Sequence, residues 1–252
     1  MNAMARHLPK GVLVVFEGID GAGKTTQAQA LVASLCESGY DAVYGKEPTD
    51  GPWGQKIKRS ASTVRMPLDE EITAFLEDRK EHCAKLVVPA LKEGKIAVLD
   101  RYYYSTAAYQ GERGADPDEI LRMNEVFAPQ PDAMFILEVP IDVSMDRIKR
   151  RGCPDNEFEK EESLARCAEI FKGIDRPYIR RLNGCLPISE LSYDIEIAVQ
   201  EGLLRQSEWS SSTPSNISLV QLTKLAEQIR DDSSVPVNEK AETLLRAAIR
   251  SN

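Results

Sequence analysis

A glycine-rich stretch near the start of the chain, VVFEGIDGAGKTTQ, constrains the fold more than any other feature of the sequence. It fits the pattern G-x-x-x-x-G-K-[ST], follows a short apolar segment at 12–16 and precedes a helix-like segment that runs to Leu35. Glycines let backbone N–H groups turn toward an anion, and the start of the helix adds the positive end of its dipole. The pattern predicts a strand, a phosphate-binding loop and a helix. The predicted contacts to the polyphosphate come from Gly18, Ile19, Asp20, Gly21, Ala22, Gly23, Lys24, Thr25 and Thr26.

Three side chains of this loop have separate expected roles. Lys24 is placed to reach the terminal phosphates, and Thr25 can offer its hydroxyl to Mg²⁺. Asp20 adds a carboxylate to an anion site, so we expect its side chain to point out of the loop toward a second substrate. GTPases, motor ATPases, transporters and small-molecule kinases all use such loops, so the loop alone does not name a reaction.

Composition and charge narrow the class of protein. The chain has 252 residues, of which 42% are hydrophobic, as expected for one large globular domain. A net charge of −8 argues against general nucleic-acid binding, which normally needs a basic surface. No apolar run approaches the ~20 residues of a membrane span, so we expect neither a membrane segment nor a signal peptide. The five cysteines lack a C-x-x-C spacing, which favours reduced thiols and a cytoplasmic location.

Short β-branched segments alternate with longer amphipathic ones along the first 190 residues. This alternation predicts an α/β fold, with a five-stranded parallel sheet covered by helices on both faces. Ligands of such folds bind at the carboxyl ends of the strands. The predicted strands are 12–16, 42–44, 96–99, 134–139 and, more weakly, 185–188.

The third predicted strand ends in Asp100 and Arg101, and DRYYYSTAAYQG continues from there. The carboxylate could hold Mg²⁺ through water, and the arginine offers a planar fork to a phosphate. If this segment is helical, Arg101, Ser105 and Tyr109 share one face, because they are four residues apart. The three consecutive tyrosines are either part of a site or a packed aromatic cluster.

A helix predicted from Asp69 to Leu91 has Phe75 and Arg79 on its apolar stripe. An aromatic face beside a guanidinium suits a nucleobase, because one group can stack and the other can donate hydrogen bonds. An internal salt bridge or an arginine that reaches solvent are the alternatives for Arg79. This pair points to a nucleotide as the acceptor.

Basic residues follow the fourth predicted strand. Arg147, Arg150 and Arg151 could close over phosphates as part of a lid at about 150–163, or form a solvated helix end.

The composition of the chain changes after about residue 206. Residues 1–205 are expected to form the catalytic domain. Residues 206–252 are expected to contain linkers and two short amphipathic helices, a C-terminal extension of unknown role.

Five ordered motifs extend these interpretations: FEGIDGAGKTTQ, KEP, AFLEDR, DRYYYSTAAYQG and PDAMFILEVP. These motifs lie between Val12 and about Glu190, and over that range the sequence closely resembles the thymidylate kinase family. The resemblance implies a three-layer sandwich of the P-loop NTP hydrolase type. It also implies a homodimer that uses ATP and Mg²⁺ to convert dTMP to dTDP.

The resemblance assigns roles residue by residue. Phe75 would stack on thymine, Arg79 would bond the edge of the base, and Tyr109 would lie under the sugar. Asp20 would meet the 3′-hydroxyl of dTMP or a lid arginine. The implied dTMP-binding set is Asp20, Glu47, Pro48, Phe75, Arg79, Arg101, Ser105, Thr106 and Tyr109. The ATP site is residues 18–26 with Arg147, the catalytic residues are Lys24, Asp20, Arg101, Arg150 and Arg151, and the metal residues are Thr25 and Asp100.

Three positions depart from the pattern of many relatives. Lys46 stands where an arginine is common, Thr106 stands where some relatives have a side-chain amide, and Gly21 stands where some have an arginine. Two rival functions remain at this point. One is a kinase for another nucleoside monophosphate, such as dUMP, UMP or a purine, and the other is a non-catalytic nucleotide-binding scaffold that acts through its C-terminal tail.

Overall fold

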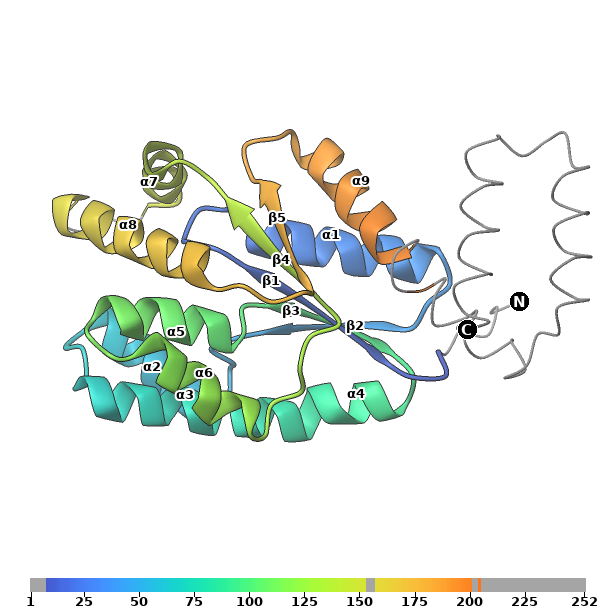
Figure 1. The fold of residues 1–252 in the computed structure, drawn as a ribbon, viewed down its shortest axis with the longest axis horizontal. Coiled ribbons are helices and arrows are strands. Elements are labelled where there is room, and N and C mark those ends of the chain that lie inside the picture. Colours follow the sequence, from blue (N-terminus) through green and yellow to red (C-terminus); the bar gives the residue numbers. More distant parts are fainter. Residues whose placement is uncertain (1–7, 153–156, 201–203, 205–252) are drawn as a thin grey trace, which may run out of the picture. The chain divides into compact units, whose positions relative to one another are not determined.

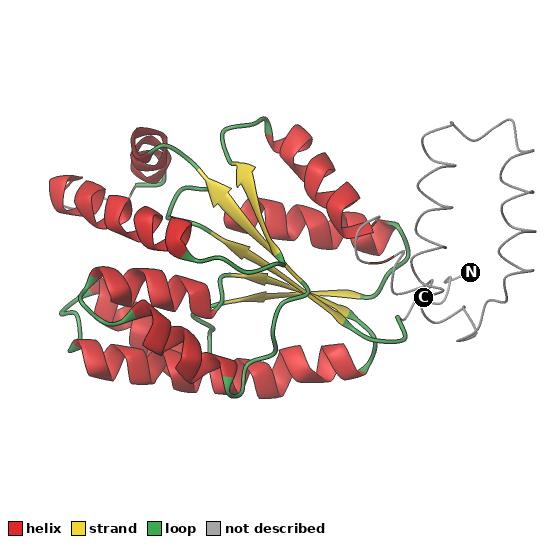
Figure 2. Cartoon of the chain, in the orientation of Figure 1, coloured by secondary structure: helices red, strands yellow, loops and turns green. Residues whose placement is uncertain are grey.

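Parallel strands form one sheet in the computed structural model, which describes residues 8–152, 157–200 and 204 (Figure 1). The strands are β1 (Val12–Glu17), β2 (Ala42–Lys46), β3 (Ile96–Asp100), β4 (Ala133–Glu138) and β5 (Ile179–Asn183). The helices are α1 (Lys24–Glu37), α2 (Pro52–Ser62), α3 (Leu68–His82), α4 (Val88–Lys92), α5 (Tyr103–Glu112), α6 (Pro117–Glu125), α7 (Ile141–Arg150), α8 (Glu157–Gly173) and α9 (Ile188–Val199), with a π-helical turn, η1 (Cys83–Val87), between α3 and α4. The sheet order is β2-β3-β1-β4-β5, and helices lie on both sides of it (Figure 2). The predicted three-layer α/β fold is confirmed.

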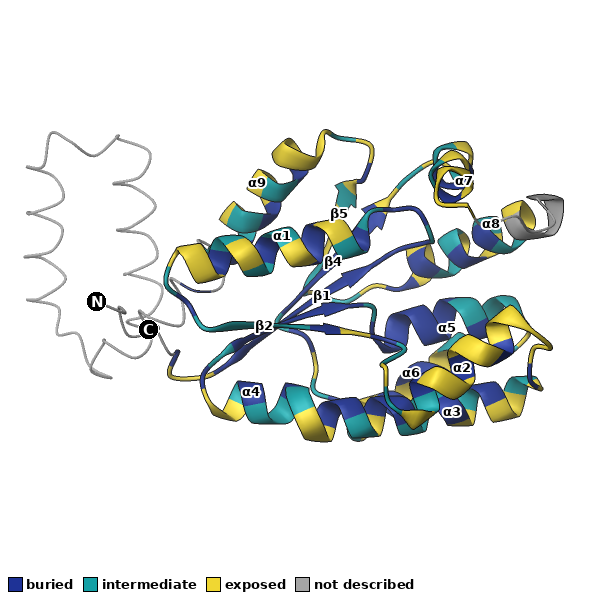
Figure 3. Cartoon of the chain, turned by 180° about the vertical axis from the view of Figure 1, so that it is seen from behind, coloured by how far each residue is buried: buried dark blue, intermediate teal, exposed yellow. Residues whose placement is uncertain are grey.

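The sheet separates two apolar layers. Along β1, Val12, Val14 and Phe16 face α1 and α9, whereas Leu13 and Val15 face the layer that includes α5 and α8. This alternation follows from the two-residue period of a strand, and both faces are covered because parallel strands need crossover helices. Figure 3 accordingly shows β1 as buried along its length.

Four predicted strands are confirmed to within two residues at each end, but the fifth prediction, 185–188, is wrong. Strand β5 is Ile179–Asn183, and residues 184–187 form a turn that leads into α9, which begins at Ile188. Strand β5 lies at the edge of the sheet, where only one neighbour, β4, pairs with it. Its arginines are exposed, so the segment lacks the apolar run that marks a central strand.

The helix predicted at 69–91 is present but interrupted by η1. Pro89 is the second residue after the end of this turn. Proline has no N–H to donate, and its ring crowds the carbonyl four residues earlier, here that of Lys85. A π-helical turn widens the backbone at this carbonyl, so the helix can continue through the proline.

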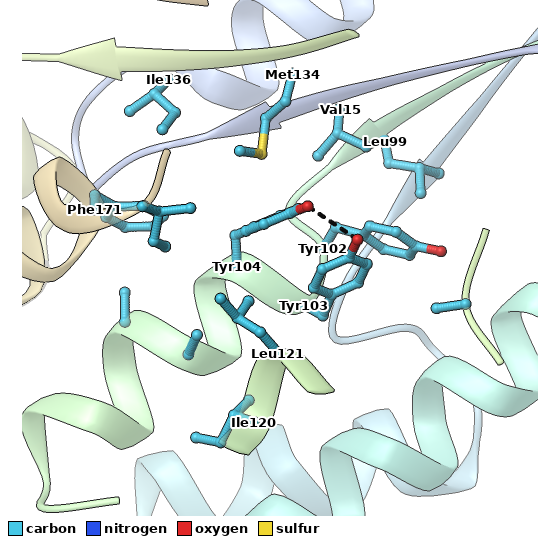
Figure 4. Packing of buried hydrophobic residues seen from close by; sticks show 14 of the residues in the cluster. Val15, Leu99, Tyr102, Tyr103, Tyr104, Ile120, Leu121, Met134, Ile136 and Phe171 are labelled. Atoms are coloured by element: carbon cyan, nitrogen blue, oxygen red, sulfur yellow. Dashed lines mark hydrogen bonds between the residues drawn. The ribbon is translucent and has the colours of Figure 1, made fainter. Parts of the chain in front are cut away.

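The three consecutive tyrosines form a packed cluster (Figure 4). Tyr102, Tyr103 and Tyr104 are fully buried beneath the sheet. The hydroxyls of Tyr103 and Tyr104 are 2.9 Å apart, and that of Tyr104 is 2.6 Å from the hydroxyl of Tyr178. These tyrosines belong to the core, so they form the packed cluster, and the Tyr102 ring also faces the guanidinium of Arg79, whose central carbon is 5.5 Å from the ring centroid.

Two predictions fall largely outside the described residues. The proposed linkers and helices of 206–252 lie there entirely, and so do the side chains of 153–160 in the predicted lid. Among the described helices, none combines the length and the apolar character needed to cross a membrane.

Arg181 fastens the edge strand to the rest of the sheet, and we expect its loss to be measurable. Its Nη1 lies 3.0 Å from Oε1 of Glu138, and its Nη2 donates to the carbonyls of Phe171, Lys172 and Ile174 at the end of α8. Arg181→Ala should lower the free energy of unfolding by about 1–2 kcal/mol, because hydrogen bonds from a charged donor are lost. Urea denaturation provides the measurement.

The adjacent Arg180 supplies the control for this test. It is exposed on the same strand, and the described residues give its side chain no hydrogen-bond or ion-pair partner. Arg180→Ala should change stability by less than about 0.5 kcal/mol. Equal effects of the two substitutions would contradict the role given to Arg181.

Candidate active site

The loop between β1 and α1 has the backbone of a phosphate cradle. Gly18 and Gly23 have φ angles of 131° and 104°, which side-chain-bearing residues rarely adopt. A Cβ on Gly18 would lie 2.5 Å from the carbonyl oxygen of Leu137, whereas one on Gly23 would meet nothing within 4 Å. No side chain caps the start of α1, so its first N–H groups and its dipole are available to an anion.

Lys24 is held inside this loop. Its Nζ donates to the carbonyl oxygens of Gly18 at 2.9 Å and Ile19 at 2.8 Å. Burial and the nearby charge of Arg101 together lower the pKa of Lys24 to about 7, against the opposing charge of Asp20. An anion placed in the loop would favour the ammonium form, so the side chain is suited to a phosphate.

The predicted metal residues lie together at the end of β3. Thr25 Oγ1 donates to Oδ2 of Asp100, and the same oxygen is 3.2 Å from both the Tyr44 hydroxyl and Lys46 Nζ. A hydroxyl and a carboxylate are oxygen ligands of the kind that Mg²⁺ prefers. Thr25 and Asp100 therefore fit a magnesium ion. Lys46 also lies 3.3 Å from Thr25 Oγ1, which places its charge beside the end of the phosphate loop.

Arg101 joins the phosphate loop to the second site. Its guanidinium forms an ion pair with Asp20, donates to Ser105 Oγ at 3.0 Å and lies over the Tyr109 ring, 5.1 Å from its centroid. Asp20 was expected to meet the acceptor or a lid arginine, but in this structure it pairs with Arg101. The three residues expected on one helix face do lie together, although Arg101 precedes α5 and has a φ of 74°.

Glu17 holds the turn at Arg101, and the sequence reasoning did not select it. The fully buried carboxylate accepts hydrogen bonds from the backbone N–H of Tyr102 at 2.8 Å, and from the N–H and hydroxyl of Ser105 at 3.1 and 2.5 Å. It thus binds the start of α5. A carboxylate that ends an otherwise apolar strand, directly before the phosphate loop, was the signal that could have identified it.

Arg79 is fully buried and nearly saturated with partners. Its Nε and Nη2 donate to Oε2 of Glu47 at 2.9 and 2.6 Å, its Nη1 donates to Asn124 at 2.6 Å, and its Nη2 also donates to Thr106 at 3.0 Å. Four of the five N–H donors of the guanidinium are thus used within the described residues. The internal salt bridge is therefore present. Only the fifth N–H of the guanidinium remains for a ligand, so Arg79 can give a ligand one hydrogen bond and not a bidentate pair.

Other predicted acceptor residues lie around Arg79. Phe75 is half-buried and packs against a small apolar cluster of α2 and α3, and Pro48 follows Glu47 through a cis peptide bond. Within the described residues, the buried Gln110 Oε1 and Tyr109 hydroxyl have no hydrogen-bond partner. A buried polar atom without a partner is costly, so these two atoms mark where a polar ligand fits. Gln110 had not been selected from the sequence.

The basic residues after β4 separate into two kinds. Arg147 donates to the carbonyls of Gly21 at 3.1 Å and Gly184 at 3.0 Å, so it links the phosphate loop to the turn after β5. Arg150 and Arg151 are exposed at the end of α7 and contact no other predicted site residue in the described structure. Thr26 is also exposed, on the first turn of α1.

Comparison with known proteins identifies the family. The model of a family described as Thymidylate kinase matches residues 16–188. The chain belongs to the thymidylate kinase family. Curated relatives named "Thymidylate kinase" include one from Xanthomonas oryzae pv. oryzae (strain PXO99A), which is 47% identical over 169 residues, 67% of this chain and 74% of the relative. Another, from Desulfotalea psychrophila (strain LSv54 / DSM 12343), is 45% identical over 193 residues, 76% of this chain and 95% of the relative.

The family match covers the whole site of this thymidylate kinase family member. Glu17, at the end of β1, and Arg147, on α7, both lie within residues 16–188. The match ends at the first residue of α9, so most of that helix lies outside it. The three departures, Gly21, Lys46 and Thr106, all lie within the matched residues.

Glu17 should make stability depend on pH. Burial raises the pKa of Glu17 from 4.5 to about 7, against the hydrogen bond from Ser105 and the charge of Arg101. Between pH 4.5 and 7 the folded chain therefore binds more protons than the unfolded chain, and this contribution to stability is lost as pH rises. In Glu17→Gln the contribution is absent. From pH 5 to pH 8, the variant should gain about 3 kcal/mol relative to the wild type in urea denaturation.

The control is Glu37→Gln, at the exposed end of α1. Its stability should follow that of the wild type across the same pH range. Parallel pH curves for the wild type and Glu17→Gln would contradict the raised pKa of the buried carboxyl group.

Proposed function

We propose that this chain transfers the γ-phosphoryl group of ATP to the 5′-phosphate of dTMP, giving ADP and dTDP, by in-line displacement. The observation that carries the proposal is the ion pair of Asp20 and Arg101. It connects the phosphate-binding loop with an arginine that also contacts Ser105 and Tyr109, two predicted acceptor residues. The membership of the thymidylate kinase family supports the same acceptor.

The chemistry needs charge and position more than proton transfer. The 5′-phosphate of dTMP is already an anion at neutral pH, so no general base is required. Lys24 and Arg101 would hold the two phosphates against their mutual repulsion, and Arg150 or Arg151 would add charge from the lid. Thr25 and Asp100 would hold Mg²⁺, which neutralises charge on the β- and γ-phosphate oxygens when bound.

The acceptor pocket would be built around Arg79. Phe75 offers a face for the base, and Arg79 offers its remaining N–H to a carbonyl oxygen on the base edge. Gln110 offers its unpartnered side-chain oxygen to an N–H of the base. The Tyr109 hydroxyl would lie beside the sugar. Glu47, Pro48, Ser105 and Thr106 would line or support the same pocket.

Assembly and location are proposed as well. We expect a homodimer in the cytoplasm, as the resemblance to the family implies. Exposed apolar side chains, Met123 on α6 and Val126 directly after it, support a protein contact at this part of the surface. Light scattering of the purified chain would measure the mass of the assembly.

A substrate panel tests the function directly. With ATP and Mg²⁺ saturating, ADP release should be fastest with dTMP among dTMP, dUMP, UMP, dCMP and purine monophosphates. The single N–H of Arg79 and the oxygen of Gln110 suit the carbonyl and the N–H of thymine or uracil, so dCMP and the purine monophosphates should react slowly. Tyr109 beside the sugar should disfavour the 2′-hydroxyl of UMP, and the 5-methyl group that dUMP lacks should add apolar contact area for dTMP. Faster turnover with UMP or a purine monophosphate would favour the rival kinase activity. No release above background with any monophosphate would favour the scaffold.

Arg101 gives a sharper prediction about the site. Arg101→Ala should lower kcat/KM for dTMP by at least about a hundredfold, with a lower kcat and a higher KM, because a partly buried charge that holds the acceptor phosphate is removed. The matched control is Arg122→Ala on α6, whose arginine is exposed and pairs only with Glu119 in the described structure. Unchanged kinetics in Arg101→Ala would remove this residue from the phosphate site.

A further inference from the structure

Helix α3 turns a polar stripe toward the interior of the protein. Asp78, Arg79 and His82 are all buried on this helix, and each contacts segment 47–49, which follows β2. Asp78 accepts hydrogen bonds from the N–H of Thr49 at 2.9 Å and from its hydroxyl at 2.5 Å. Burying polar groups is costly unless they are paired, so helix α3 and segment 47–49 hold each other in place.

Glu47 divides its two carboxylate oxygens between two partners. Oε2 accepts both hydrogen bonds from Arg79, and Oε1 lies 3.0 Å from Nδ1 of His82. Burial opposes the ionisation of Glu47, but the charge of Arg79 and the hydrogen bond from His82 outweigh it and lower its pKa. An ionised carboxylate only accepts, so Nδ1 of His82 carries the proton in this contact. With Oε1 held, the carboxylate cannot rotate away from Arg79.

The position of the imidazole is built into the neighbouring strand. A Cβ on Gly45 of β2 would lie 2.7 Å from Nε2 of His82, 2.9 Å from its Cε1 and 2.6 Å from Cδ2 of Leu99. Gly45 belongs to a regular strand, so glycine is needed here for space and not for an unusual backbone conformation. The strand therefore makes room for a histidine ring that presents Nδ1 to Glu47.

We infer that His82 is a positioning residue for base recognition. Its one side-chain hydrogen bond in the described structure goes to Glu47, so it acts on Arg79 through that carboxylate. Through Glu47 it fixes the guanidinium of Arg79, whose four engaged N–H groups determine the direction of the fifth. The inference rests on the proposed function and specifies how the site would select a pyrimidine with a carbonyl oxygen at the recognised edge.

Two substitutions of the histidine test this assignment. His82→Leu removes the donor, whereas His82→Asn keeps an amide N–H close to the position of Nδ1. For His82→Leu we expect KM for dTMP to rise about tenfold, with kcat and KM for ATP within about threefold of the wild type. The ratio of kcat/KM for dTMP to that for dCMP should fall about tenfold, because dCMP carries an amino group in place of one carbonyl. His82→Asn should restore both values to within about threefold.

The control lies two residues away on the same helix, on its exposed side. Lys80 is exposed and pairs with Glu77, and Lys80→Ala should leave KM for dTMP and the dTMP/dCMP ratio unchanged. Melting temperatures of all variants separate stability from recognition. If His82→Leu lowers the melting temperature while leaving the dTMP/dCMP ratio unchanged, the residue is only structural and the inference is overturned. An equal rise of KM for ATP and for dTMP would overturn it too.

If the leucine variant does not fold, a comparison of His82→Asn with His82→Gln still tests the inference. The glutamine amide reaches toward the Nε2 position, so only the asparagine should retain the kinetics of the wild type. Equal kinetics of these two variants would overturn the inference. A wild-type chain that fails to phosphorylate dTMP would overturn the proposed function and this assignment together, whereas an unchanged ratio in the variants would overturn the assignment alone.

Discussion

The parallel pairing of β1 with β3 is the constraint on which the site depends. Their register places Phe16 opposite Asp100, so both strands end at the same level of the sheet. The chain then turns into the phosphate loop after one strand and into Arg101 after the other, and the N–H of Arg101 donates to the carbonyl of Phe16 at 3.0 Å. Two segments more than 80 residues apart thus meet as neighbours, as expected at the carboxyl ends of parallel strands.

Charged side chains are concentrated at these strand ends, and each has polar or oppositely charged partners. Glu17 accepts from the start of α5, Asp20 pairs with Arg101, and Asp100 is shared by Thr25 and Lys46. The burial of Glu17 and Lys24 shifts both of their pKa values toward 7, which shows that the fold places ionisable groups where water stabilises them poorly. Such an arrangement costs stability without ligands but is already organised for phosphates, so little reorganisation is needed on binding.

The sequence predicted the layers and the phosphate loop well, because both depend on local patterns. The loop has a fixed spacing of glycines, and the central strands are continuous apolar runs that only a buried parallel sheet explains. Strand β5 was misplaced because an edge strand needs no such run. The roles of Glu17 and Gln110 were missed for another reason. The charge that ends β1 marks Glu17 as unusual, but the partners of both residues, Ser105 and Glu71, are far away in sequence and are set by the packing of distant segments.

Arg79 shows why a residue type and its spacing define a site only in part. On the apolar stripe of a predicted helix, an arginine indicates either a ligand contact or an internal salt bridge, and the structure shows that the second is present without excluding the first. A guanidinium that is free to move could donate to many acceptors. One held by Glu47, Asn124 and Thr106 can donate only along its remaining N–H. Selectivity then comes from the partners that restrict the arginine, and these partners stand on α5, α6 and the segment after β2, around an arginine on α3. Recognition of the base is therefore a property of how these elements pack together, not of one side chain.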